Sequence, residues 1–159
     1  MNPDMKKDIK SLSPRLALLP LATILGSWLG AVVAYLIMNI ELTSVLQHRS
    51  LNDCLALNSG FAYYSLSSIF ITEYRGAELG TIALLANIIR EMTTLLLTPL
   101  LAKWFGPLAP ISTGGATTMD TTLPIITQTI GQRYVALSIY HGFVTDFSVP
   151  FLVTMWCML

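Results

Sequence analysis

The segment TGGATTMDTTLP, residues 113–124, decides how this chain can fold. Its adjacent glycines, the threonine pairs on either side of Asp120 and the closing proline are poor material for a continuous helix in lipid. Irregular backbone at membrane depth is tolerated where it lines a cavity, and there the free helix ends offer carbonyls to cations and N–H groups to carboxylates. We therefore predict an interrupted helix with Asp120 at the break, where a cation or a proton can reach it. The alternative is a bent helix in which Asp120 is paired structurally.

The composition around this segment is typical of a membrane protein. Of the 159 residues, 53% are hydrophobic and 11% are charged, whereas a soluble domain carries about 25% charged residues. Lys plus Arg number 9 and Asp plus Glu number 9, so the net charge is zero. The chain therefore lacks the basic field that a nucleic-acid partner would require.

Motifs for catalysis and for cofactors are missing from the sequence. It contains no phosphate-binding loop, metal-binding histidine pair, nucleophile elbow or haem pattern. Cys54 and Cys157 have no spacing that predicts a disulfide framework or a metal site. We therefore expect neither an enzyme nor a bound cofactor.

The uncharged stretches predict an all-α membrane protein with about five transmembrane helices, at roughly 20 apolar residues for each crossing. One or more of these helices should be discontinuous. The predicted spans are 16–38, 54–72, 79–102, 107–130 and 134–157, after an N-terminal segment over 1–15. The first span is too long for the apolar region of a secretory signal, which is about 7–15 residues.

The basic residues predict the orientation, because they concentrate in cytoplasmic loops. With five crossings, a cytoplasmic N-terminus leaves Arg49 and Lys103 outside, the former in an outer loop over 39–53. The inner side then holds Lys6, Lys7, Lys10, Arg15, Arg75 and Arg133. We expect a multi-pass protein with its N-terminus inside and its C-terminus outside.

Charged residues within the predicted spans are candidates for function, since intramembrane acids usually line a pathway or pair with a counter-ion. Asn87, Glu91, Thr94 and Thr98 share one helical face. Arg90 points about 100° away from Glu91, so it can hold Asp120 or an acid on another chain. The competing interpretation makes Arg90 and Glu91 an interhelical ion-pair latch without a transport role.

Weaker polar patterns occur on two other predicted helices. Tyr63, Ser67 and Ser59 share a face that can line a polar route or form a packing seam. His141 is either a satisfied packing residue or part of a proton relay. Asp146 can simply be solvated near the outer end of the last span.

Several ordered motifs together resemble the LysO-type lysine exporter family. They are ALNSGFAYYSLSS over 56–68, NIIRE over 87–91, GGATTMDTTLP over 114–124, and HGF over 141–143 with Pro150. The resemblance implies an inner-membrane protein that exports L-lysine and its analogue thialysine, with an essential acid at Asp120. Family members in one piece are roughly twice this long. The resemblance therefore implies half of a larger transporter fold, completed by a separate small membrane subunit that carries a second acid.

These observations lead us to expect a subunit of a secondary exporter of L-lysine, working by alternating access in exchange for protons. Asp120 would bind an ammonium group or the proton, and helix-end N–H groups near Gly114 and Gly115 would bind the carboxylate, with Arg90 as the competing ligand. The polar lining would be completed by Asn87, Glu91, Tyr63, Ser67, Thr118 and His141. The alternatives are an exporter of another amino acid or a cation, and a membrane scaffold that transports nothing.

Overall fold

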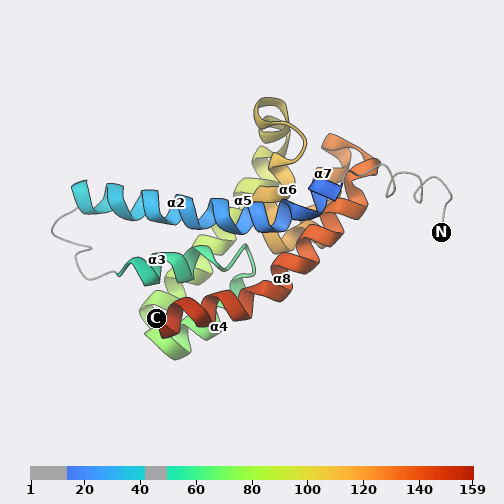
Figure 1. The fold of residues 1–159 in the computed structure, drawn as a ribbon. Helices are drawn as coiled ribbons and strands as arrows, with labels where there is room; N and C mark the ends of the chain where they lie inside the picture. Colours follow the sequence, from blue (N-terminus) through green and yellow to red (C-terminus); the bar gives the residue numbers. More distant parts are fainter. Residues whose placement is uncertain (1–13, 42–49) are drawn as a thin grey trace.

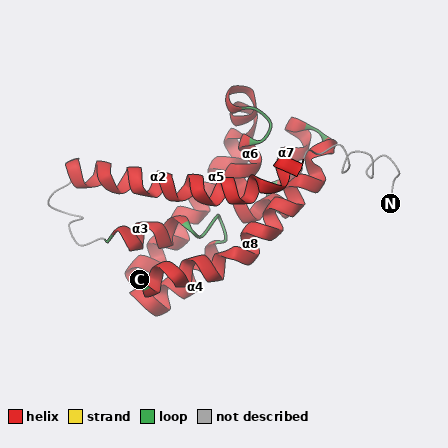
Figure 2. Cartoon of the chain, viewed as in Figure 1, coloured by secondary structure: helices red, strands yellow, loops and turns green. Residues whose placement is uncertain are grey.

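A computed structural model describes residues 14–41 and 50–159, and every regular element in these ranges is a helix (Figure 2). Three helices are long and apolar enough to cross a membrane. They are α2 (Leu19–Glu41), preceded by the short 3-10 helix η1 (Pro14–Leu18), α5 (Ala77–Phe105) and α8 (Val135–Met158) (Figure 1). The prediction of an all-α membrane protein is confirmed. Most of the predicted segment over 1–15 and of the predicted outer loop over 39–53 lies outside the described residues.

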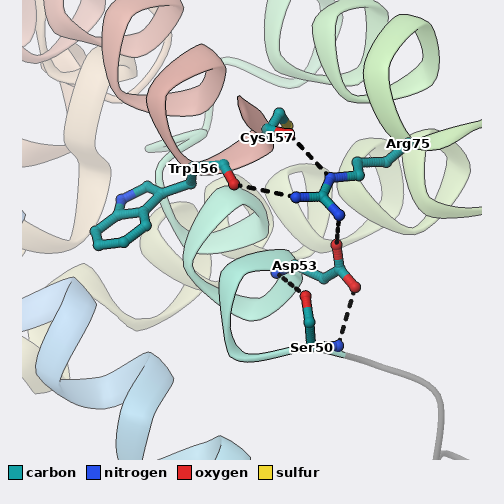
Figure 3. Close-up of polar contacts among 5 residues, drawn as sticks. All are labelled: Ser50, Asp53, Arg75, Trp156 and Cys157. Carbon is teal, nitrogen blue, oxygen red and sulfur yellow. Dashed lines mark hydrogen bonds and ion pairs between the residues drawn. The ribbon is translucent and has the colours of Figure 1, made fainter. Parts of the chain in front are cut away.

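The predicted span over 54–72 is wrong as a single helix, because the chain reverses in its middle. Helix α3 (Leu51–Asn58) ends at Ser59, and α4 (Tyr64–Arg75) begins after a turn in which Phe61 and Ala62 have positive φ angles of 45° and 68°. At the far ends, Arg75 lies 3.7 Å from Asp53 (Figure 3). Since the start of α3 and the end of α4 are neighbours, the two helices form a hairpin, which we call the first hairpin.

The predicted interruption within 107–130 is confirmed. Helix α6 (Ala109–Gly114) gives way to the 3-10 helix η2 (Gly115–Met119), and α7 (Leu123–Ile130) follows, ending before the 3-10 helix η3 (Gln132–Tyr134). Leu108, before α6, and Ile130, at the end of α7, pack against one apolar cluster. The segment therefore also turns back on itself, and we call it the second hairpin.

Two apolar clusters lie at opposite ends of the helix bundle. One holds Ile71 of α4, Leu79 at the start of α5 and Val153 near the end of α8, so the first hairpin opens at this end. The other holds Ile111 of α6 and Leu137 at the start of α8, so the second hairpin opens at the opposite end. Phe61, at the tip of the first hairpin, belongs to the first cluster, and the tip of the second hairpin contacts it there.

The hairpins change the predicted placement of two basic residues. Arg75 donates a 3.1 Å hydrogen bond to the carbonyl of Cys157, so it lies at the end where α8 finishes (Figure 3). Lys103 lies in the last turn of α5, at the other end of the bundle. The expected sides of Arg75 and Lys103 are therefore exchanged, because a hairpin returns to the end where it began.

Candidate functional site

The hairpin tips are joined through their backbones. The N–H of Ala116 donates a 2.9 Å hydrogen bond to the carbonyl of Phe61. Gly115 adopts a φ of +60°, and a Cβ there would lie 2.4 Å from that carbonyl oxygen. Only glycine tolerates both this conformation and this approach, which explains one of the two adjacent glycines in the segment over 113–124.

Asn87 holds the tip of the first hairpin against α5. Its Oδ1 accepts a 2.8 Å hydrogen bond from the N–H of Ala62, and its Nδ2 donates to the carbonyl of Ala83 at 2.9 Å and to Oγ of Ser67 at 3.3 Å. Gly60 lets this side chain approach, since a Cβ on Gly60 would lie 2.3 Å from Nδ2. The side chains of Asn87 and Ser67 therefore hold the turn of the first hairpin against α5, and we call this pair the bracket.

Arg90 holds the tip of the second hairpin. Its Nε donates to the carbonyl of Thr113 at 3.0 Å and its Nη2 to that of Ser112 at 3.3 Å. These carbonyls lie at the C-terminal end of α6, where a cation is favoured. The guanidinium also lies 5.4 Å from the ring centroid of Phe61. Within the described ranges Arg90 forms no ion pair with Asp120 or Glu91, the two carboxylates considered for it.

His141 and Thr118 connect three elements in the buried interior. Nε2 of His141 hydrogen-bonds with Oγ1 of Thr23 on α2 at 2.9 Å, and Nδ1 with Oγ1 of Thr118 on η2 at 3.3 Å. Thr118 also donates to the carbonyl of Ser138 at 2.9 Å. Both ring nitrogens of His141 are therefore hydrogen-bonded, and its side chain ties α8 to α2 and η2.

A cavity of about 190 Å³ lies beside the joined tips. This is room for several water molecules, which occupy about 30 Å³ each in the liquid. The lining comes from both hairpins and α8: Ala62, Tyr63, Tyr64, Ser65, Ala116, Thr117, Met119, Asp120, Thr121 and Asp146.

The lining combines carboxylates with a helix N-terminus. Asp120 is exposed and accepts a close hydrogen bond from the N–H of Thr121, while Asp146 is half-buried. Neither has a cationic partner in the part of the chain that the structure describes. The 12-residue helix α4 begins at Tyr64 without a side-chain cap, so its first N–H groups have no intrahelical acceptor and carry a partial positive charge. The cavity can therefore bind cations and a carboxylate at the same time.

The structure brings only some of the sequence-predicted site residues into the cavity. Asp120 and Tyr63 line it, whereas Ser59, the third residue of that predicted face, accepts a 3.0 Å hydrogen bond from the indole N–H of Trp28. The framework around the cavity is built by Asn87, Arg90, Gly114, Gly115, Ser67, Thr118 and His141. Glu91 is half-buried on α5 and does not line the cavity.

The donors expected for a carboxylate lie elsewhere than predicted. Gly114 and Gly115 lie at the C-terminal end of α6, where helix carbonyls rather than N–H groups lack intrahelical partners, and their carbonyls accept hydrogen bonds from Oγ1 of Thr117 and of Thr118. The N–H of Ala116 is already bonded to Phe61. Tyr64 and Ser65, the first residues of α4, line the cavity, and Asp146 is an additional acid in the lining. The only local signal for the start of α4 was Gly60 after a short apolar run.

Comparisons with known proteins agree on one family. The family described as Lysine exporter LysO matches residues 1–157. The protein named Lysine exporter LysO of Escherichia coli K12 is 32% identical over 142 residues, which cover 89% of this chain and 44% of that protein. A Haemophilus influenzae protein whose name proposes lysine export is 34% identical over 129 residues, covering 81% of this chain and 61% of that protein. No solved structure matches the chain. The chain thus spans less than two thirds of either relative.

Proposed function

This chain belongs to the lysine exporter LysO family, and we propose that it forms part of an inner-membrane exporter of L-lysine. Its substrate site includes the cavity beside the joined hairpin tips. The observation that carries this proposal is the presence of Asp120, Asp146 and the uncapped N-terminus of α4 in one cavity. The family supports a membrane transporter rather than an enzyme.

Lysine has a group for each feature of this cavity. Its α-carboxylate can accept hydrogen bonds from the N–H groups of Tyr64 and Ser65, as anions do at helix N-termini. Its two ammonium groups can bind the carboxylates of Asp120 and Asp146. A neutral amino acid would leave one of these carboxylates without a cation, and a site built around such groups rejects a ligand that leaves them unpaired.

The same two carboxylates suit an exchange of lysine for protons. Like charges in one cavity repel each other, so either a bound cation or a proton stabilises the pair. In an alternating-access cycle, lysine would leave on the outside and a proton would replace it for the return. The hairpin tips are the natural moving parts, because they are short and meet in the middle of the fold.

The basic residues support an N-terminus inside the cell and a C-terminus outside. With three crossings and two hairpins, the inner end of the bundle carries Lys103 and Arg133, and the outer end carries Arg75 beside Asp53. The N-terminal lysines of the sequence add to the inner side. This distribution follows the positive-inside rule.

The full exporter needs more chain than this sequence provides, because the relatives are longer. We propose that a separate small membrane subunit supplies the remainder, including a second essential acid. Co-purification of the tagged chain with such a subunit would support this part of the proposal, and export by the chain in liposomes without any second polypeptide would contradict it.

The test of the proposed function replaces Asp120 with Asn in the full chain at its native locus. We expect lysine efflux and resistance to thialysine to be lost, while the amount of protein in the membrane is unchanged. Glu73→Gln is the matched control, because Glu73 is an exposed acid of α4 outside the cavity. Retained lysine efflux in the Asp120→Asn variant would refute the site. If the unsubstituted protein exports arginine or a neutral amino acid in place of lysine, the exporter has another substrate.

A further inference from the structure

The middle of α5 carries a carboxylate for which the described chain offers no partner. Glu91 is the central residue of this 29-residue helix, with about 21 Å of helix on either side. The hydrocarbon core extends only about 15 Å from its centre, so Glu91 lies near the bilayer midplane when α5 spans the membrane. A glutamate side chain is too short to reach the headgroups from there.

The surroundings of Glu91 in this chain cannot satisfy its charge. No hydrogen bond or ion pair joins the side chain of Glu91 to another residue of the described ranges. Its neighbour Arg90 is already bonded to the carbonyls of Ser112 and Thr113.

Of the residues one turn away from Glu91, Asn87 and Thr94 are buried and already hydrogen-bonded within the chain. The others, toward the outer side of α5, are apolar: Ile88, which is 36% exposed, and half-buried Leu95. An ionised group facing lipid here is strongly disfavoured.

We propose that the face of α5 formed by Leu84, Ile88, Glu91 and Leu95 docks a membrane-spanning helix from the part of the exporter outside this sequence, and that this helix presents a hydrogen-bond donor to Glu91. The inference rests on the proposed function, because it assumes an exporter larger than this chain. The relatives extend well beyond the matched region, which leaves enough chain for such a helix. This face of α5 suits such a helix because the Glu91 carboxylate needs a hydrogen-bond donor from outside the described chain.

Two other features of the chain agree with this assignment. The outward face of α2 exposes Leu25, Leu29 and Leu36 and carries no charge, as expected for contact with lipid. A second copy of this chain would be a poor occupant of the α5 face, because a symmetric contact would place two Glu91 side chains together. The adjacent guanidinium of each copy is engaged within its own chain.

The experiment places the photo-crosslinker p-benzoylphenylalanine at Ile88 of the full chain in its native membrane, with Leu29 on α2 as the matched control. We expect Ile88 to crosslink to a peptide from outside this sequence, and mass spectrometry to identify that peptide as an apolar helix with a donor side chain near its middle. The Leu29 position should give no protein adduct. Adding Glu91→Leu should reduce the Ile88 adduct at least tenfold, whereas Glu91→Gln should keep more than half of it.

Three results would overturn the inference: an adduct between two copies of this chain, no protein adduct from Ile88, or an adduct insensitive to Glu91→Leu at equal membrane levels. Asp120→Asn separates this inference from the proposed function, because it should abolish efflux and leave the adduct unchanged. Retained efflux in that variant would defeat the site at Asp120 without touching the docking face.

Discussion

The N–H of Ala116 donates a 2.9 Å hydrogen bond to the carbonyl of Phe61, and this bond joins hairpins that open at opposite ends of the bundle. The contact determines where the functional groups lie. Tyr64 starts α4 three residues after Phe61, and Asp120 follows the end of η2, four residues after Ala116. Joining the tips therefore places a helix N-terminus and a carboxylate in one cavity.

Substituting Gly115 with Ala should break the contact between the tips. The substituted residue would occupy a φ of +60° and place its Cβ 2.4 Å from the Phe61 oxygen. Backbone strain and overpacking each cost about 1–3 kcal/mol, so we expect a loss of about 2–6 kcal/mol in the free energy of unfolding. Thermal unfolding of the purified protein in detergent would show this loss as a lower unfolding temperature.

The control for this substitution is Gly26→Ala in α2, where an added Cβ meets nothing within 4 Å. Alanine is favoured over glycine in a helix, so this variant should unfold at the wild-type temperature or slightly above. Equal stability of the Gly115 and Gly26 variants would contradict the geometry of the tips.

Substituting Asn87 with Leu should release the first hairpin from α5. The N–H of Ala62 would lose its acceptor and remain buried, which costs about 1–3 kcal/mol. Asn87→Asp keeps the acceptor and should be less destabilising than Asn87→Leu if its carboxyl is protonated. The side chain of half-buried Asn52 on α3 forms no hydrogen bond with residues 14–41 or 50–159, so Asn52→Ala should be nearly neutral. An equal loss at both asparagines would argue against the bracket.

Substituting Asp146 with Asn should weaken lysine export although the residue lies on a different element from Asp120. Both acids line the cavity, and loss of a charge-assisted hydrogen bond to a bound ammonium typically costs about 1.5–3 kcal/mol, or a factor of about 10–100 in affinity. Concentration dependence of lysine uptake into inverted vesicles would show this as a higher half-saturating concentration. Wild-type behaviour of Asp146→Asn would restore the interpretation that this acid is merely solvated.

The break in the second hairpin could be predicted from sequence because its causes are local. Gly115 disfavours a helix, and Pro124 cannot sit in a helix interior but is accepted in a first turn, which is where α7 places it. The reversal in the first hairpin could not be predicted from sequence, because Phe61 and Ala62 are ordinary residues that the fold holds at positive φ. The contact that stabilises the turn comes from Asn87, in the next long helix.

The residues of the cavity and its framework also differ in whether local sequence or packing between elements determines their place. Asp120 is recognisable because it lies within the break itself. Asp146 reaches the cavity only because α8 packs closely on η2, where a Cβ on Gly142 would lie 2.7 Å from the N of Met119. Arg90 likewise finds its carbonyl partners only once α6 has ended at Gly114. Such partners depend on packing between elements and leave no periodic signal in the sequence.

The two-hairpin topology predicts which positions share a side of the membrane. In a background with Cys54→Ala and Cys157→Ala, single cysteines at Asn52 and Glu73 should react with a membrane-impermeant maleimide from one side. Cysteines at Lys103 and Arg133 should react from the other side. The reason is that the first hairpin starts and ends where Asp53 meets Arg75, whereas the second starts and ends at the opposite cluster.

Five full crossings make the opposite prediction for each pair, since a span over 54–72 would separate Asn52 from Glu73 and a span over 107–130 would separate Lys103 from Arg133. The comparison within each pair does not depend on the orientation of the whole protein. The absolute sides then test the positive-inside assignment: in intact cells the Glu73→Cys variant should be labelled, and the Lys103→Cys variant only after the membrane is opened. If the two members of a pair react from opposite sides of the membrane, the segment between them crosses the membrane.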